Sequence, residues 1–401
     1  MGFKENFLKY VSFDTTSSEE YKNKPSNPNE YELAKYLKGQ LEGLGVKDLH
    51  INEFATVYGY FPGDPEKEPI YLIAHLDTSN QASGKNIKPR CVIYDGAPIE
   101  LSKGIYLSEA EFESLKDKVG HELIVTDGTT LLGGDDKAGI AIIMSLLELL
   151  HENPSIKHCP IEVIFNSDEE IGIGASHITT SLIKSKYGYT VDGGALKYIA
   201  NENFNAASVN VLIKGRSIHP GDAKDKMINS LNVAHDFHAS LPTFLRPEHT
   251  EGRVGFYHLT DLKGNEEETS MSYIVREHSR SKLELMLDLI RKSADRINER
   301  FNANIVHLDI KNQYCNMKDI IDKNPEITKR IEEAYQKLGI HYEFEPIRGG
   351  TDGAQLTFLG YPTPNIATGD YNCHGRFEFV DVNESLSVIQ ILLEMVKNEK
   401  Y

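Results

Sequence analysis

The stretch Pro160-Ile161-Glu162-Val163-Ile164-Phe165 runs directly into Asn166-Ser167-Asp168-Glu169-Glu170-Ile171-Gly172. Its first part is an alternating run of apolar residues, which predicts a strand that enters a sheet. Three consecutive carboxylates at the end of a buried strand raise one another's pKa, so stability alone does not explain them. We expect something cationic to face them, either a metal ion or a cluster of lysine or arginine, unless they only face water.

Length and charge limit the classes of protein to which the chain can belong. Its 401 residues favour two domains, and 40% hydrophobic with 26% charged residues is typical of a globular protein. The net charge of −17 argues against nucleic acid or an anionic membrane as a partner. The four cysteines form no CxxC pair, and the sequence predicts neither a signal peptide nor a membrane span, so we expect a cytoplasmic protein.

The first half of the chain alternates between helical and extended patterns. We expect helices at residues 3–13, 30–44 and 138–150, strands at 56–61, 69–74, 160–166 and 187–194, and a loop with short strands at 79–104. Strands that alternate with helices and end in acidic residues predict an open α/β sheet. Such sheets bind ligands beyond the carboxyl ends of their strands.

The pattern changes between residues 206 and 312. Six elements are expected there in the order βαββαβ, at 209–213, 227–241, 254–262, 271–275, 282–301 and 305–310. This order is that of a ferredoxin-like α+β domain. Helical patterns return at 325–338 and 385–396, so the smaller domain is expected to be inserted into the larger one. The predicted division is an α/β catalytic domain of residues 1–205 and 313–401, and an inserted domain of residues 206–312.

Acids and histidines recur at predicted strand ends and in glycine-rich turns. They are His75, Asp77, Asp135, Asp136, Glu169, Glu170, Asp192 and His374. An α/β sheet would bring most of them to one edge. Imidazole with carboxylate is a ligand set for zinc, manganese or cobalt, and the number of carboxylates favours two metal ions.

Each of these residues has a simpler explanation when it is taken alone. A histidine at a strand end is more often a hydrogen-bonded core or surface residue than a ligand. Asp135 could cap the helix that follows it, and Asp192, before two glycines, could be a turn residue. Jointly these explanations are weaker, because the residues follow apolar runs rather than lying on polar faces.

Five motifs resemble those of the dizinc aminoacylase/carboxypeptidase family of metallopeptidases. They are Ala74-His75-Leu76-Asp77-Thr78, Gly134-Asp135-Asp136-Lys137-Ala138-Gly139, Asp168-Glu169-Glu170-Ile171-Gly172, Val191-Asp192-Gly193-Gly194 and Asn372-Cys373-His374-Gly375. Residues 203–210, 218–221 and 348–355 further resemble family members that act on tripeptides. The resemblance covers the whole chain in order and implies that the inserted domain is a lid.

The resemblance implies a role for each candidate ligand. Asp135 would bridge two zinc ions, for which cobalt or manganese could substitute, and a cis peptide would follow it. His75 and Asp192 would complete one metal site, and Glu170 and His374 the other. Cys373 precedes a predicted ligand, so ligation by its thiolate instead of His374 stays open.

Two further acids have implied roles in catalysis. Asp77 would hold the second nitrogen of the His75 imidazole. Glu169 would be the general base, which takes a proton from a metal-bridged water and later delivers it to the leaving amine.

Three residues are expected to bind substrate. By the same resemblance, His219 would stabilise the oxyanion of the tetrahedral intermediate, although before Pro220 it could also be a surface turn residue. Arg348, in a glycine-rich loop, would hold the terminal carboxylate of the substrate through a bidentate contact. Arg276 could share that task or form a salt bridge on the lid surface.

The leading interpretation is a metal-dependent aminopeptidase that releases the N-terminal residue from tripeptides. The alternatives within the family are a dipeptidase, a carboxypeptidase and an N-acyl-amino-acid deacylase. A non-catalytic, metal-stabilised protein is the alternative from another class. Glu169 and Asp77 count against it, because a structural metal site needs neither a base nor an open coordination position. Edge strands of the lid could pair between subunits, so a homodimer is compatible with the sequence.

Overall fold

The computed structural model describes residues 2–20 and 24–398, which form two compact units. The first unit comprises Met1–Asn201, Asp319–Glu345 and Thr351–Tyr401, and the second comprises Glu202–Lys318 and Pro346–Gly350. The predicted inserted domain, residues 206–312, falls inside the second unit. The fold class is therefore the predicted one, an α/β domain with an inserted α+β domain.

An eight-stranded sheet forms the centre of the described part of the first unit. Its order is β1-β2-β8-β3-β9-β16-β10-β15. The strands are β1 (Lys47–Ile51), β2 (Val57–Phe61), β3 (Ile70–His75), β8 (Ile161–Asn166), β9 (Gly188–Gly193), β10 (Tyr198–Ala200), β15 (Glu343–Phe344) and β16 (Asn365–Ala367). Strand β3 is parallel to both of its neighbours, β8 and β9, so three carboxyl ends meet at one edge of the sheet. Every residue of β3 and β8 is buried, as expected for strands covered on both faces.

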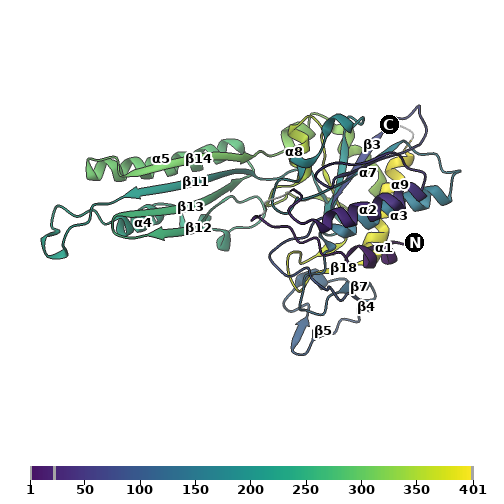
Figure 1. The fold of residues 1–401 in the computed structure, drawn as a ribbon, viewed down its shortest axis with the longest axis horizontal. Helices are drawn as coiled ribbons and strands as arrows, with labels where there is room; N and C mark the ends of the chain where they lie inside the picture. Colours follow the sequence, from purple (N-terminus) through teal and green to yellow (C-terminus); the bar gives the residue numbers. More distant parts are fainter. Residues whose placement is uncertain (1, 21–23, 399–401) are drawn as a thin grey trace. The chain divides into compact units, whose positions relative to one another are not determined.

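Helices cover this sheet (Figure 1). They are α1 (Phe3–Tyr10), α2 (Asn29–Gly43), α3 (Gly134–Glu152), α7 (Pro325–Leu338), α8 (Asp352–Phe358) and α9 (Val382–Lys397). The short helix α6 (Lys318–Ile321) lies where the chain passes from the second unit back into the first. Helix α3 packs against β3 and β9 and is buried along almost its whole length. A Cβ atom at Gly139 would lie 1.9 Å from the carbonyl oxygen of Val191, so this close approach of α3 to β9 requires glycine.

A second, smaller sheet completes the first unit. It has the order β17-β18-β7-β4, from β4 (Arg90–Ile93), β7 (Glu122–Val125), β17 (Asp370–Tyr371) and β18 (Phe379–Asp381), next to a ribbon of β5 (Ile99–Ser102) and β6 (Ile105–Leu107). Strands β4 and β5 lie in the segment predicted to be loop with short strands. The strands without a sequence-based prediction are β1, β6, β7, β10, β15, β16, β17 and β18. Strand β1 is largely exposed and therefore lacks an apolar pattern.

The second unit has the predicted βαββαβ order. Its elements are β11 (Asn205–Lys214), α4 (Ser230–Ala239), β12 (Phe256–Gly264), β13 (Glu268–Glu277), α5 (Arg280–Phe301) and β14 (Val306–Tyr314). The strands form one antiparallel sheet in the order β12-β13-β11-β14. Helices α4 and α5 pack on it around a separate core that includes Phe237, Tyr273 and Leu287 (Figure 1). Among the described residues, no helix combines the length and apolar character needed to cross a membrane.

Candidate metal centre

The predicted ligands come from separate segments of the first unit and meet at the carboxyl edge of its large sheet. His75 is the last residue of β3, and Asp192 lies near the end of β9. Glu170 follows β8 in the chain, Asp135 lies in the first turn of α3, and His374 lies between β17 and β18. The end of each central strand thus supplies one candidate ligand, as the α/β fold requires.

Asp135 lies between two groups of ligand atoms. On one side, His75 Nε2 is 2.8 Å from Asp135 Oδ1 and 3.9 Å from Asp192 Oδ1. On the other side, His374 Nε2 is 3.1 Å from both Asp135 Oδ2 and Glu170 Oε2. Within each group the ligand atoms lie within 4.8 Å of one another. A carboxylate with one oxygen in each group has the arrangement of a bridge between two cations.

The donor set fits metal ions. Among the described residues, the buried Oε1 atom of Glu170 has no hydrogen-bond partner. Burial, followed by the charges of Asp136 and Asp135, raises the pKa of Asp192 well above its ordinary value, and burial also raises that of Glu170. Cations at this point would satisfy the unpaired oxygen and remove the cost of the clustered carboxylates.

Carboxylate neighbours raise the pKa of both candidate histidine ligands. Hydrogen bonds with Asp135 and Glu170 raise the pKa of His374 to about 11. Burial lowers the pKa of His75, but hydrogen bonds with Asp135 and Asp77 outweigh it and raise the pKa well above its ordinary value. Metal ions bind the neutral imidazole, so binding here would release protons and weaken as the pH falls.

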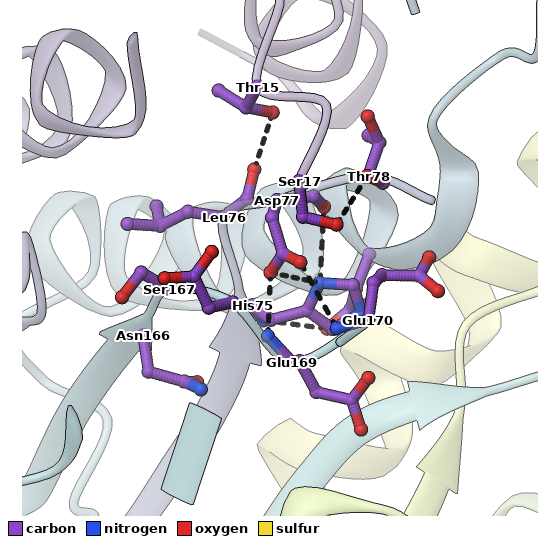
Figure 2. A network of polar contacts seen from close by, with 12 residues as sticks. Thr15, Ser17, His75, Leu76, Asp77, Thr78, Asn166, Ser167, Glu169 and Glu170 are labelled. Atoms are coloured by element: carbon purple, nitrogen blue, oxygen red, sulfur yellow. Dashed lines mark hydrogen bonds and ion pairs between the residues drawn. The ribbon is translucent and has the colours of Figure 1, made fainter. Parts of the chain in front are cut away.

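Asp77 connects the end of β3 with the loop after β8 (Figure 2). Its Oδ1 atom accepts the backbone N–H of Glu169 at 3.0 Å, and its Oδ2 atom accepts that of Glu170 at 3.1 Å. His75 Nδ1 lies 3.3 Å from Asp77 Oδ1 and 3.1 Å from the Asp77 carbonyl oxygen. An N–H at Nδ1 leaves Nε2 as the lone-pair nitrogen that faces Asp135.

Glu169 differs from its neighbour Glu170. Among the described residues, it belongs to neither group of ligand atoms. Burial, and then the charge of Asp352, raises the pKa of Glu169 well above its ordinary value. Asp352 is itself buried, accepts the backbone N–H of Ala175 at 2.8 Å and accepts a hydrogen bond from the side chain of Asn166.

Two aspartates and a cysteine near the candidate ligands have hydrogen bonds that the sequence did not indicate. Asp136 follows Asp135 across the predicted cis peptide and accepts the backbone N–H groups of His75 at 3.1 Å and Gly139 at 3.2 Å. Asp168 accepts the N–H of Ser26 at 2.9 Å. The Cys373 thiol donates to Asp370 at 2.9 Å and does not join either group of ligands in the described structure.

The three predicted substrate-binding residues belong to the second unit. His219 is exposed, and its Nδ1 atom accepts the N–H of Gly221 at 3.2 Å, which places the proton of the neutral ring on Nε2. Arg276 Nη1 donates to the carbonyl of Val275 at 3.1 Å, and its guanidinium lies 5.2 Å from the centre of the Tyr314 ring.

Arg348 has contacts that sequence patterns did not predict. Its Nη1 atom donates to the carbonyls of Gly252 at 2.6 Å and Val254 at 3.0 Å, and its Nη2 atom donates to the Thr250 hydroxyl at 3.1 Å. Its guanidinium also lies 5.2 Å from the centre of the Phe204 ring. In this conformation Arg348 holds the loop at residues 250–254.

Comparisons with known proteins identify the family. The sequence model described as "Peptidase family M20/M25/M40" matches residues 125–398. The chain belongs to this peptidase family. It is 42% identical over 398 residues to "Peptidase T" of Geobacillus sp. (strain WCH70), covering 98% of this chain and 97% of the relative. It is 43% identical over 396 residues to "Peptidase T" of Clostridium novyi (strain NT), with the same shares covered.

Solved structures have the fold of this M20 peptidase. An aminopeptidase PepT from Bacillus cereus ATCC 10987 matches with a TM-score of 0.78 and 22% identity. A tripeptidase from Staphylococcus aureus subsp. aureus mu50 matches with a TM-score of 0.78 and 20% identity. Each comparison covers 98% of this chain and 97% of the other. The predicted family is therefore confirmed, and the chain is a hydrolase.

The contacts of Asp77 generate a prediction. Asp77→Asn keeps the shape of the side chain but replaces one acceptor oxygen with a donor, which faces the N–H of Glu169 or Glu170. We expect the affinity for zinc to fall about 10–100-fold, as is typical when a group that orients a metal ligand is lost. Titration of the metal-free protein with zinc by calorimetry measures this change.

A matched control is Asp95→Asn, because exposed Asp95 also accepts a backbone N–H, that of Ala97 at 2.9 Å. The control should bind zinc as the unmodified chain does. Equal zinc affinity in the Asp77 and Asp95 variants would show that Asp77 does not orient the ligands.

Proposed function

We propose that this M20 peptidase is a cytoplasmic dizinc aminopeptidase that releases the N-terminal residue from tripeptides. The observation that carries the proposal is Asp135, whose two oxygens face separate groups of ligand atoms. The relatives named Peptidase T support the reaction, and the similar structure named a tripeptidase supports the substrate class. The four free cysteines, Cys91, Cys159, Cys315 and Cys373, support a reducing compartment.

Each ligand has a proposed place in the centre. Asp135 Oδ1, His75 and Asp192 would hold one ion, and Asp135 Oδ2, Glu170 and His374 would hold the other. When bound, the two ions would polarise the scissile carbonyl and lower the pKa of a water molecule. Cobalt and manganese accept the same ligand types and could substitute for zinc.

Glu169 would move the protons of the reaction. Its backbone N–H is fixed by Asp77, while its carboxylate is not committed to either group of ligands. It would accept a proton from the attacking water and deliver it to the leaving amine. The burial of Glu169 and the charge of Asp352 raise its pKa, which counteracts the lowering that nearby cations cause.

Residues of the second unit are proposed to contact the substrate. The Nε2–H of His219 is the kind of donor that a developing oxyanion requires. Arg276 and Arg348 would bind the terminal carboxylate of the tripeptide. A guanidinium has five N–H donors, so Arg276 keeps donors for a carboxylate beside those on Nη1. Arg348 would have to exchange at least one of its present contacts.

A panel of peptides tests the proposed activity. We expect zinc-loaded protein to cleave free tripeptides after the first residue, with kcat/KM at least about tenfold above that for dipeptides, tetrapeptides and acetylated amino acids. A difference of this size corresponds to the loss of one charge-assisted hydrogen bond between the enzyme and the substrate. A chelator should abolish the activity and added zinc restore it. Preference for acetylated amino acids would instead identify a deacylase, and preference for dipeptides a dipeptidase.

The neighbouring glutamates allow a paired test of the mechanism. Glu169→Gln should retain both zinc ions but lose about 10²–10⁴-fold in kcat, because the general base is gone. Glu170→Gln should lose zinc affinity, because a ligand is weakened. Metal analysis and steady-state kinetics on both variants measure this. Loss of zinc from the Glu169 variant would make Glu169 a ligand and contradict its role as base.

The proposed carboxylate contact predicts a selective effect on KM. Arg348→Ala should raise KM for free tripeptides by about 10-fold or more, the value of one charge-assisted contact, and should change KM for C-terminally amidated tripeptides far less. Arg276→Ala is the parallel variant. If KM rises equally for free and amidated substrates, the arginine acts on the structure of its own unit and not on the carboxylate.

A further inference from the structure

A buried carboxylate outside the predicted site, that of Glu378, accepts hydrogen bonds from the backbone of the turn that carries Asp135. Glu378 Oε2 accepts the N–H groups of Leu132 at 2.5 Å and Gly133 at 2.9 Å. Its Oε1 atom accepts those of Gly134 at 2.6 Å and Asp135 at 3.2 Å. Four successive backbone N–H groups thus converge on one side chain that is only 2% exposed.

The turn has the shape of an anion-binding nest. Gly133 has a φ angle of 81°, in the left-handed region, which turns successive N–H groups toward one point. A Cβ atom at Gly134 would lie 2.4 Å from the Asp370 carboxylate, so this position also requires glycine. The four N–H groups of the turn Leu132-Gly133-Gly134-Asp135 therefore share one acceptor group, the Glu378 carboxylate.

The position of Glu378 is fixed by the small sheet. It immediately precedes β18, whose Phe379 pairs with Val125 of β7, and the turn at residues 132–135 follows β7 in the chain. Its own N–H donates to the carbonyl of Gly375, at the end of the loop that carries His374. One short segment thus supplies His374 as a candidate ligand and the carboxylate that holds Asp135.

We propose that Glu378 is a positioning residue that sets the two oxygens of Asp135 for both metal ions at once. The inference rests on the proposed dizinc function. It makes a specific statement about affinity: because Asp135 would be the shared ligand, loss of the Glu378 carboxylate should weaken both ions together. Loss of His75 or His374 would act first on one ion.

The variant Glu378→Gln tests this inference. Its amide group must turn a donor toward the backbone N–H groups, so the turn should open. We expect the metal-free, full-length variant to bind both equivalents of Co²⁺ at least about tenfold more weakly, by calorimetry. The visible absorption spectrum of the bound Co²⁺ should change as well, because the geometry of a ligand changes.

The matched control is Glu162→Gln, which removes another buried carboxylate of the same unit. Glu162 accepts the N–H groups of Lys184 at 2.9 Å and Ser185 at 2.6 Å and contacts no candidate ligand. This control should lose stability while its Co²⁺ affinity and spectrum stay unchanged. If the Glu378 variant behaves in the same way, Glu378 is a structural residue only and the inference fails.

A milder variant keeps the test decisive if Glu378→Gln does not fold. Gly133→Ala retains the carboxylate but strains the left-handed residue of the same turn, so a smaller loss of affinity for both ions is expected. Unchanged Co²⁺ affinity in this folded variant would overturn the inference. Failure of the unmodified chain to bind two ions would instead contradict the proposed function itself, so the two failures are distinguishable.

Discussion

The arrangement of the metal centre depends on the hydrogen bonds that the carboxylate of Asp77 accepts. It joins the end of β3 to the loop after β8 through the backbone N–H groups of Glu169 and Glu170, and it lies beside His75 Nδ1. These two strands are parallel neighbours, so their ends are already close. Asp77 converts that proximity into a fixed orientation of one imidazole and two adjacent carboxylates (Figure 2).

Buried carboxylates of two kinds surround the centre, and their hydrogen bonds separate them. Asp77, Asp136 and Glu378 accept backbone N–H groups with both of their oxygens. Each therefore holds a loop or turn through its own hydrogen bonds. Glu170 keeps an unpaired buried oxygen among the described residues, and Asp135 has an oxygen facing each histidine. These two carboxylates are therefore available to bind cations.

Most of the fold and the grouping of ligands could be predicted because both follow from local patterns. Apolar runs marked β3, β8 and β9, and the acids or histidines at their ends necessarily share one edge of a parallel sheet. The succession of strand and helix patterns from Val209 to Ile310 likewise indicated the βαββαβ order. Several strands were missed, among them β1, which is polar and exposed, and β7, which is short.

The supporting residues could not be predicted, because their partners are distant in the chain. Nothing in the sequence around Glu378 indicates that it fills a turn more than 240 residues earlier. The same holds for Asp352, whose partner Asn166 lies 186 residues away. Because Arg348 lies in a glycine-rich loop, it was expected to face a carboxylate of the substrate. Its present partners are instead carbonyls of a loop in the second unit. The catalytic and substrate-binding roles stay proposals that rest on this geometry and on the family.

The central claim is that Asp135 bridges two metal ions. Anomalous diffraction at the zinc edge, from crystals grown with zinc, tests it most directly. The account predicts two peaks roughly 3.5–4 Å apart, one next to Asp135 Oδ1 and His75 and the other next to Asp135 Oδ2 and His374. A single peak, or a second peak without contact to Asp135, would contradict it.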